Sequence, residues 1–527
     1  MYYRHTVVKF NDLFRGGAVP VPRIIVIGAG VGGLTAALCL ATRGLAVVVV
    51  EQAGTPGGKM REIEVDGRHL DGGPTVLTMK WVLDEIFADA GTALAEHVTL
   101  RSLDLLARHA WSPNERLDLF ADVGRSADAI GDFAGPGEAR RYREFCAWTR
   151  QIYQTLETPF LRSPRPSLRK LVAAKAAGCE LWPLAPFSTA WRALGRYFHD
   201  PRLRQLFGRY ATYCGSSPFL APATLMLIAH VEQCGVWIVD GGMHRLAAAL
   251  ARLATARGAQ LRYGVGAAEI VVVDGRVAGV TLSTGERLDA DAVIVTADVA
   301  AVAAGRLGRT VAGVVSPVRY SQRSLSAMTW ALLAECEGFP LVRHNVFFSR
   351  DYAAEFHDLF ARGRLPTTPT VYICAQDRTG PMAVGRDGPE RLLCLINAPP
   401  IGDMHAIAAR ELDQCEQRTF EHLERCGLHI RRRVVRVTTP SDFERMFPST
   451  GGALYGRASH GWLASFRRPG SRTRMRGLYL AGGSTHPGAG VPTAALSGRS
   501  AAASLLVDFA STGRFGRAAM RGGMSTR

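Results

Sequence analysis

Continuous apolar runs and glycine-rich turns alternate near the start of the chain. A β-branched run at 23–27 ends in the sequence GAGVGG at 28–33, after which apolar residues recur at helical spacing as far as Gly44. A second apolar run at 45–50 is followed by Glu51. Because strands buried on both faces have continuous apolar sequences, this pattern predicts a strand–helix–strand unit with two parallel strands.

Later parts of the chain fall into blocks of helical and strand pattern. The sequence AGPG at 134–137 interrupts the first block, and a mostly helical stretch, interpreted as an insertion, follows it to about residue 236. The further elements that the pattern predicts are a helix at 243–257, strands near 271–273, 277–282, 292–296, 327–335, 369–375, 391–397 and 476–480, and a final helix at 494–506. The three short strands from 327 to 397 indicate a second sheet.

The glycine-rich turn at 28–33 has the spacing of a dinucleotide-binding fingerprint. Gly28 permits the tight turn, Gly30 lets the backbone approach a pyrophosphate, and Gly33 allows close contact between helix and strand. The N-terminus of the following helix supplies N–H donors and a positive dipole end to the phosphates. Glu51 would accept hydrogen bonds from an adenosine ribose, and its charge disfavours NADP. The alternative is a glycine-rich turn without a ligand.

Glycine pairs outside this unit decide between FAD and NAD. Gly57, Gly58 and Lys59 follow it directly and could line the other side of a diphosphate. The sequence LDGGPTVLT at 70–78 could approach a flat ring closely, and the segment 478–502 again places glycines between a strand and a helix. An NAD domain does not need that distant segment, and there is no second GxGxxG for a nicotinamide reductant. The pattern therefore favours FAD.

Together these motifs resemble those of the bacterial-type carotenoid (phytoene) desaturases, a family of the FAD amine-oxidase-like superfamily. The resemblance spans residues 23 to about 508 and is carried by VIGAGVGGLTAALCLATRG, VVVEQAGTPGGKM, LDGGPTVLT, WIVDGGMHRLAAALARLA and YLAGGSTHPGAGVPTAALSGRSAA. Within the family, GPTVLTMKWVLDEIF at 73–87 and GGSTHPGAGVPTAALSG at 482–498 look more like the hydroxycarotenoid 3,4-desaturases than the phytoene desaturases.

The resemblance implies a tightly bound FAD without a nicotinamide. At Ala267 the family often has a valine whose backbone meets the adenine, so this chain departs conservatively there. The cofactor-binding residues expected on this basis are Gly28, Gly30, Gly33, Glu51, Gly57, Gly58, Lys59, Thr75, Ala267, Gly483 and Val491. We expect no metal ion.

We therefore predict an α/β fold with a Rossmann-like FAD-binding domain assembled from N-terminal, central and C-terminal segments. A substrate-binding sheet and a helical, membrane-contacting subdomain are inserted between these segments. The predicted boundaries are 1–22 for an N-terminal extension, 23–137, 236–306 and 474–510 for the three parts of the FAD-binding domain, 138–235 for the helical subdomain, 307–473 for the substrate-binding sheet and 511–527 for a basic disordered tail.

Composition and cysteine usage limit the classes of protein that fit. The 527 residues are 47% hydrophobic and 21% charged, which is typical of a globular enzyme rather than of a disordered or collagen-like chain. The ten cysteines form no CxxC pair and no cluster with histidine at zinc spacing, so we expect buried thiols in a reducing cytoplasm. Residues 1–22 lack the apolar core of an export signal.

The chain carries a formal net charge of +17, which is compatible with nucleic acid or an anionic membrane surface as a partner. The basic residues are spread along the chain and form no nucleic-acid-binding motif, so we expect anionic lipid and no nucleic acid. The segment 161–191 mixes basic and large apolar side chains and predicts a peripheral membrane patch, the alternative being an amphipathic helix packed on the core. Its members are Arg162, Arg165, Arg169, Lys170, Lys175, Leu181, Trp182, Leu184, Phe187 and Trp191. We expect the protein at the inner face of a bacterial membrane.

The resemblance implies that a CH2–CH2 unit of an acyclic carotenoid becomes CH=CH. A flavin can take the hydride equivalent, and a proton must also leave. His486 is the candidate proton acceptor because it lies in a flavin-proximal motif, although a turn histidine bonded to the backbone is the alternative. Arg143 and Arg150 could orient a terminal oxygen or belong to a solvated helix surface. Oxygen or a quinone would reoxidise the flavin.

The predicted function is the C-3,4 desaturation of acyclic 1-hydroxy- or 1-methoxycarotenoids. One alternative is a phytoene or neurosporene desaturase acting at interior bonds. A flavin-dependent carotenoid cis–trans isomerase and a non-catalytic FAD-binding scaffold are alternatives from other classes.

Overall fold

The computed structural model describes residues 21–165, 188–378 and 388–511. Its centre is a parallel five-stranded sheet with the strand order β19-β13-β1-β2-β9. The strands are β1 (Arg23–Ile27), β2 (Ala46–Val50), β9 (Gln260–Arg262), β13 (Ala292–Val295) and β19 (Leu478–Leu480). Three separate regions of the sequence thus build one sheet, which confirms the predicted assembly of the Rossmann-like domain.

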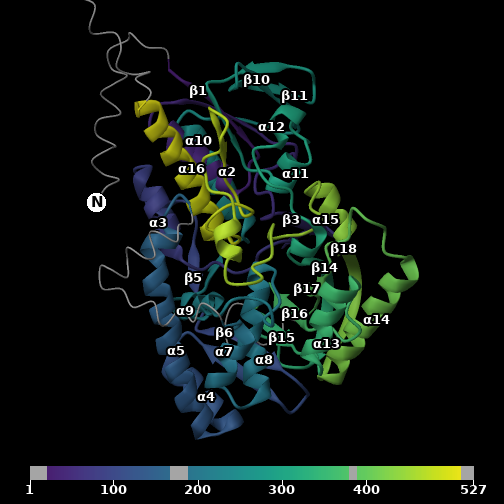
Figure 1. The fold of residues 1–527 in the computed structure, drawn as a ribbon. Coiled ribbons are helices and arrows are strands. Elements are labelled where there is room, and N and C mark those ends of the chain that lie inside the picture. Colours follow the sequence, from purple (N-terminus) through teal and green to yellow (C-terminus); the bar gives the residue numbers. More distant parts are fainter. Residues whose placement is uncertain (1–20, 166–187, 379–387, 512–527) are drawn as a thin grey trace, which may run out of the picture.

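Helices α2 (Val31–Ala41), α10 (His244–Ala256) and α16 (Val491–Ser511) pack together beside this sheet (Figure 1). Every residue of α2 is buried because the helix is enclosed by the sheet and by both other helices. The predicted strand–helix–strand unit is confirmed, with Ile24 and Val26 of β1 paired in register with Val47 and Val49 of β2. This arrangement places the glycine-rich turn at the carboxyl end of β1.

A three-stranded antiparallel sheet adjoins the parallel sheet. It consists of β10 (Ala267–Val273), β11 (Arg276–Leu282) and β12 (Arg287–Asp289), in that order. Val280 and Leu282 of β11 share a buried apolar cluster with Ile25 of β1 and Val293 of β13. The cluster fixes the start of β10, where Ala267 lies, close to the carboxyl ends of the parallel strands.

The second sheet has seven strands in the order β18-β14-β17-β16-β15-β6-β7. Its strands are β6 (Leu105–Ala110), β7 (Arg116–Phe120), β14 (Ser326–Gly338), β15 (His344–Phe347), β16 (Val371–Ala375), β17 (Glu390–Ala398) and β18 (Leu428–Thr438). The predicted strands of residues 327–397 are confirmed. Strands β6 and β7 also belong to this sheet, which was not predicted. They fall in the segment 23–137 that was predicted for the FAD-binding domain, but β6 pairs with β15 and β7 pairs with β6.

One group of helices covers the outer face of the seven-stranded sheet, and a second group forms a separate block beside it (Figure 1). Trp330 of β14 meets Phe420 of α14 edge to face at 5.9 Å in the core between sheet and helix. The helices near this sheet are α13 (Tyr352–His357), α14 (Ala409–Arg425) and α15 (Pro440–Met446). The shorter helices α11 (Val299–Ala303) and α12 (Arg309–Ala312) follow β13.

The predicted helical stretch is confirmed over its described parts, 138–165 and 188–235. Phe145, Phe198 and Phe207 hold its helices together, with ring centroids 4.7 to 5.2 Å apart. The block contains α4 (Val123–Ala134), α5 (Pro136–Leu156), α7 (Ala190–Tyr197), α8 (Pro201–Gly208) and α9 (Leu227–Gln233), with α3 (Lys80–Asp89) beside it. Two small two-stranded antiparallel sheets complete the fold. One pairs β3 (Glu62–Val65) with β4 (Arg68–Asp71), and the other pairs β5 (Leu100–Ser102) with β8 (Trp237–Val239).

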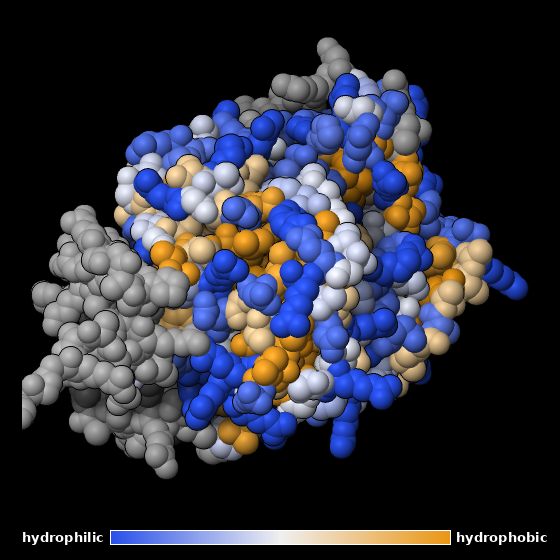
Figure 2. Space-filling view, turned by 90° about the horizontal axis from the view of Figure 1, so that it is seen from above, coloured by the Kyte–Doolittle hydropathy of each residue, from blue (hydrophilic) through white to orange (hydrophobic). Residues whose placement is uncertain are grey.

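The described helices include none whose length and apolar character would let it cross a bilayer. The surface seen from above is largely hydrophilic, with a band of apolar side chains across its middle (Figure 2).

Candidate functional site

A cavity of about 970 Å³ lies where the parallel sheet, the seven-stranded sheet and the helical block meet. Its walls come from the N-terminal segments around 28–32, 50–61 and 72–79, from the helical block, and from the C-terminal segment 482–494. Of the predicted cofactor-binding residues, those lining the cavity are Gly28, Gly30, Glu51, Gly57, Gly58, Lys59, Thr75, Ala267, Gly483 and Val491. The fold therefore gathers residues that are more than 400 positions apart in the sequence.

The fingerprint glycines differ in what surrounds them. Gly28 has φ +103°, a conformation that favours glycine, and a Cβ atom at Gly33 would lie 2.0 Å from the carbonyl oxygen of Gly28. This confirms Gly33 as the residue that lets the helix approach the strand, and it explains why Gly33 does not line the cavity. A Cβ atom at Gly30 would meet no protein atom within 4 Å, so the space beside Gly30 belongs to the cavity.

The glycine pair after β2 lies against the fingerprint turn. The N–H of Gly57 donates to the carbonyl oxygen of Ala29 at 2.9 Å, and a Cβ atom at Gly58 would lie 3.3 Å from the Cα of Gly30. Both glycines have positive φ, +125° and +58°. Two turns free of side chains thus face the same part of the cavity, next to the N-terminus of α2. Such a cradle fits a diphosphate.

Glu51 is held rigidly at the end of β2. Its Oε2 accepts a hydrogen bond from the N–H of Ala29 at 2.7 Å, and its Oε1 accepts one from Ala53 at 2.8 Å. Each carboxylate oxygen can accept a further hydrogen bond, so the group fits the hydroxyls of a ribose in the cavity. The N–H of Val265 donates to the carbonyl oxygen of Glu51 at 2.9 Å and brings the strand containing Ala267 beside it. The residues present therefore fit the ADP half of a dinucleotide.

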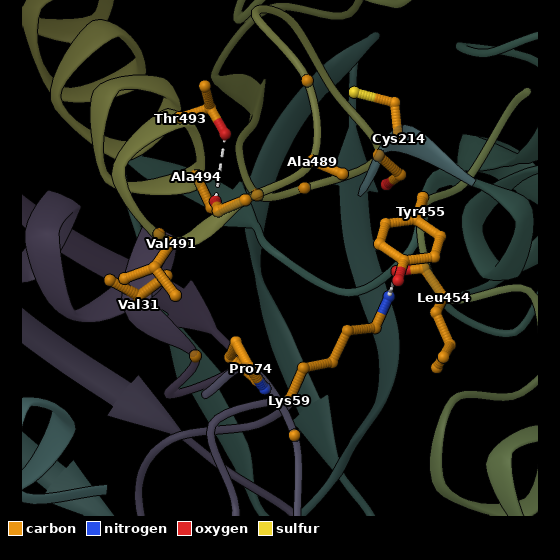
Figure 3. A pocket seen from close by; sticks show the side chains of 18 of the residues that line it. Val31, Lys59, Pro74, Cys214, Leu454, Tyr455, Ala489, Val491, Thr493 and Ala494 are labelled. Carbon is orange, nitrogen blue, oxygen red and sulfur yellow. Dashed lines mark hydrogen bonds between the residues drawn. The ribbon is translucent and has the colours of Figure 1, made fainter. Parts of the chain in front are cut away.

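The C-terminal segment closes the other side of the cavity. Gly483 and Val491 both line it, and Val491 begins α16 close to Val31 of α2 (Figure 3). The buried guanidinium of Arg468 donates from Nη1 to the carbonyl oxygens of Tyr455 and Gly483, each at 3.1 Å. These bonds fix the turn before α16 and leave the N-terminus of that helix facing the cavity.

Lys59 extends toward a different partner from the one the sequence suggests. Its Nζ donates to the carbonyl oxygen of Leu454 at 2.5 Å (Figure 3). The same Nζ lies 5.1 Å from the ring centroid of Phe447. Burial lowers the pKa of the Lys59 ammonium. Lys59 thus ties the fingerprint region to the loop at 454, and its contact with a diphosphate stays a prediction.

His486 lies behind the cavity wall. It is 2% exposed, it is not among the lining residues, and its ring meets Phe160 edge to face at 4.6 Å. Since a carbonyl oxygen can only accept, Nε2 is the donor in the 2.9 Å hydrogen bond to the carbonyl oxygen of Phe160. This is the backbone-bonded turn histidine that the sequence left as the alternative, and the placement does not favour a role as proton acceptor.

The two arginines proposed to orient a terminal oxygen lie on the outer surface of α5. Arg143 pairs with Asp128 at 3.3 Å, Arg150 is exposed, and neither lines the cavity. In the predicted membrane patch, residues 166–187 are outside the described structure. The patch members concerned are Arg169, Lys170, Lys175, Leu181, Trp182, Leu184 and Phe187.

Sequence reasoning missed Arg209, Tyr213 and Tyr372, which line the cavity between the helical block and the second sheet and form a polar cluster with the predicted residue Thr75. Arg209 donates from Nη1 to the hydroxyl of Tyr213 at 3.1 Å, and the hydroxyl of Tyr372 lies 2.7 Å from Oγ1 of Thr75. His344 approaches the same Tyr372 hydroxyl through Nδ1 at 2.7 Å. The sequence RYATYC at 209–214 is the one local signal, since Tyr372 and Thr75 come from distant strands and turns.

Comparison with known proteins gives concordant results. The model of the family described as flavin containing amine oxidoreductase matches residues 31–506. The chain is 54% identical to the hydroxyneurosporene desaturase of Rubrivivax gelatinosus, covering 96% of this chain and 97% of that protein, and 45% identical to the hydroxyneurosporene desaturase of Cereibacter sphaeroides, covering 94% and 99%. A solved oxidoreductase from Methanosarcina mazei has a TM-score of 0.57 and 18% identity over 91% of this chain and 99% of that chain, which shows a shared fold.

Proposed function

The chain belongs to the flavin-containing amine oxidoreductase family, and we propose that it is an FAD-dependent carotenoid desaturase. Its substrate would be an acyclic 1-hydroxy- or 1-methoxycarotenoid, into which it introduces the C-3,4 double bond. The observation that carries this proposal is the 54% identity to a hydroxyneurosporene desaturase over nearly the whole length of both chains. The continuous cavity supports it, because residues that fit a dinucleotide share that cavity with a space lined by apolar side chains.

When bound, FAD supplies a two-electron acceptor that takes a hydride equivalent from an allylic carbon. Glu51 and the glycine turns would bind the ADP half of FAD, because their geometry fits it. The turns at Thr75 and Val491 would then face the flavin ring, where the reaction takes place. The chemistry depends on holding the carbon chain in one orientation, so the contribution of the protein is mainly positional.

The polyene would lie between the helical block and the second sheet. Leu393 and Leu395 of β17 line the cavity on the sheet side. The apolar residues that line it on the helical side are Leu156, Phe160, Leu161, Leu225, Leu227, Ile228 and Val231. Walls of this kind exclude water and suit an apolar rod.

We also propose peripheral association with an anionic membrane. Leu220 and Trp462 are 48% and 45% exposed, although large apolar side chains are mostly buried in this protein. The N–H of Gly461 donates to the carbonyl oxygen of Leu220 at 2.9 Å, so the two exposed residues are neighbours, and Trp462 lines the cavity. Exposed apolar residues at a cavity edge support entry of an apolar substrate from lipid. Oxygen or a quinone is the proposed final electron acceptor.

Product analysis tests the proposed activity. Purified holoprotein is incubated with a 1-hydroxy carotenoid and with the unsubstituted carotenoid, and absorption and mass are recorded. We expect a red-shifted product that has lost two hydrogen atoms at C-3,4 from the 1-hydroxy substrate. Unchanged mass with an altered spectrum would instead identify an isomerase, and desaturation at interior bonds a phytoene or neurosporene desaturase. Bound flavin that no carotenoid reduces anaerobically would identify a scaffold.

A further inference from the structure

We propose that Arg209, within its group of cavity-lining tyrosines, is the subsite that binds the oxygen at C1 of the substrate. The inference rests on the proposed function and assigns the recognition of the oxygenated end group to particular residues. The ligand atom is a hydroxyl or ether oxygen that accepts a hydrogen bond at the end of an otherwise apolar rod.

Arg209 begins the short helix η4 (Arg209–Cys214) directly after α8 and lines the cavity. Among the described residues it makes one side-chain hydrogen bond, from Nη1 to the hydroxyl of Tyr213, and it interacts with the charge of Glu232 without a direct ion pair. A guanidinium carries five N–H donors and no acceptor. Most of the hydrogen-bonding capacity of Arg209 is therefore available to a molecule in the cavity.

Aromatic rings surround the guanidinium. Its central carbon lies 5.1 Å from the ring centroid of Tyr213 and 5.5 Å from that of Tyr372. Tyr352 and Tyr455 also line the cavity, and Arg209 is close enough for its charge to oppose the upward shift that burial imposes on their pKa values. Burial raises the pKa of Tyr455 to about 12, so its hydroxyl is neutral at physiological pH.

Glu232 is the acidic group whose charge acts on Arg209, but it is hydrogen-bonded to tyrosines and makes no direct ion pair with the guanidinium. Glu232 lines the same cavity, and its Oε2 accepts a hydrogen bond from the hydroxyl of Tyr210 at 2.6 Å. A cation inside a protein without an ion-pair partner is unfavourable, and the faces of aromatic rings offset only part of that cost. A buried cation that lines a cavity without a direct ion pair is therefore well placed to bind a ligand.

The position of Arg209 suits an oxygen close to the reacting bond. Tyr372, whose ring lies beside the guanidinium, is hydrogen-bonded to Thr75, and Thr75 belongs to the turn predicted to approach the flavin. That turn is packed on the Lys59 segment, because a Cβ atom at Gly73 would lie 1.8 Å from the carbonyl oxygen of Lys59. In the substrate, only C2 separates the oxygen-bearing C1 from the C3–C4 bond. An oxygen-binding group near the flavin end of the cavity meets this requirement.

The chemistry of the guanidinium also matches both proposed substrates. A hydroxyl and a methoxy oxygen share the ability to accept a hydrogen bond, and Arg209 offers donors only. Since an arginine stays protonated in proteins, Arg209 cannot take the proton that leaves carbon. Its role is to orient the substrate and to select it over an unsubstituted carotenoid.

The test compares two substrates in three variants of the full-length holoenzyme. Arg209→Met removes the donors while keeping a long apolar side chain, and Arg209→Lys keeps the charge but loses the planar fork. Arg204→Met is the matched control, because Arg204 lies outside the cavity lining and stacks on Trp191 at 4.2 Å. Turnover and equilibrium binding are measured with a 1-hydroxy carotenoid and with its unsubstituted counterpart, together with FAD content and the midpoint of thermal unfolding.

We expect Arg209→Met to lower kcat/KM for the 1-hydroxy substrate by about 10- to 100-fold, as the loss of a hydrogen bond from a charged group does, and to leave the unsubstituted substrate within about threefold. Arg209→Lys should show the same selective loss to a smaller extent, and it provides the test if Arg209→Met does not fold. Arg204→Met should match the wild type on both substrates.

Equal losses on both substrates, or a holoprotein that loses FAD when Arg209 is changed, would overturn the inference. Failure of the proposed function is recognised separately, because a wild-type enzyme that forms no 3,4-product from either substrate contradicts the function whatever the variants do. The binding measurement still tests Arg209 in that case, since a preference for the 1-hydroxy compound that persists in Arg209→Met excludes the subsite.

Discussion

A Cβ atom on Gly498 would lie 2.0 Å from the carbonyl oxygen of Gly32. The first and last helices of the FAD-binding domain, α2 and α16, therefore meet backbone to backbone. In the same contact, a Cβ atom on Gly32 would lie 3.0 Å from the carbonyl oxygen of Ala494. This close approach holds the C-terminal segment of the cavity against the fingerprint turn, although the two are separated by more than 400 residues.

Gly498→Ala tests whether this contact holds the site together. The added methyl group would meet a backbone oxygen, which cannot move aside like the end of a side chain, so we expect a loss of about 3 kcal/mol in the free energy of unfolding and a lower FAD content. Denaturant unfolding and flavin absorption measure the two effects. Gly131→Ala in α4 is the matched control, since its Cβ would make an ordinary 3.5 Å contact with Ala139. Equal stability of both variants would contradict the close helix contact.

Gly30→Val should separate cofactor binding from folding. Apart from its own chain neighbours, nothing in the protein lies within 4 Å of the position of a Gly30 Cβ, so the new side chain would project into the cavity without a clash. We expect an apoprotein whose unfolding midpoint matches that of the wild-type apoprotein and which does not take up FAD. Normal FAD content in this variant would show that the pyrophosphate does not pass Gly30.

Glu51→Ala should weaken FAD retention and also reduce stability. The carboxylate accepts hydrogen bonds from the backbone N–H groups of Ala29 and Ala53, of which the bond from Ala29 is buried. An unsatisfied buried donor costs about 1–3 kcal/mol. Removal of the proposed ribose contact adds a loss of FAD affinity of about tenfold or more. Flavin release on dilution measures the affinity. A variant purified with full FAD occupancy would remove the ribose assignment.

His109 predicts a loss of stability in acid. Burial lowers the pKa of His109 from 6.5 to about 3, so the folded protein keeps this ring neutral while the unfolded chain takes up a proton. The free energy of unfolding should therefore fall as the pH decreases from 6.5 toward 3, by up to about 1.4 kcal/mol per pH unit from this residue. His109→Gln should reduce the slope over this range relative to the wild-type protein, as denaturant unfolding at a series of pH values measures. An unchanged slope in His109→Gln would contradict the proposed linkage.

The sequence predicted those parts of the fold that depend on neighbouring residues. The strand–helix–strand unit from residue 23 to residue 50 is recognisable because its apolar runs, its glycines and Glu51 all lie within one short stretch. The pairing of β15 with β6 was not predictable in the same way. Their register joins Asn345 to Arg108, and nothing in either strand specifies a partner so far along the chain.

The candidate site shows the same division. Gly28, Gly30 and Glu51 line the cavity, and they could be singled out from the sequence because their motif already describes a local turn. His486 was expected in the site, but its own N–H donates to the carbonyl oxygen of Pro469 at 2.8 Å and its ring is bonded to Phe160, which turns it away. Arg209 was missed because its cluster with Tyr372 exists only in the folded chain, where strand β16 brings Tyr372 beside the helical block.

The central claim is that the two ends of the chain bind one cofactor together. The most direct test is to measure how much flavin the purified full-length protein contains. We expect the protein to be yellow, with FAD and polypeptide in equal molar amounts, and to recover this ratio after removal and readdition of FAD. A colourless protein that takes up no FAD during refolding would contradict the assignment of the cavity and, with it, the proposed desaturase.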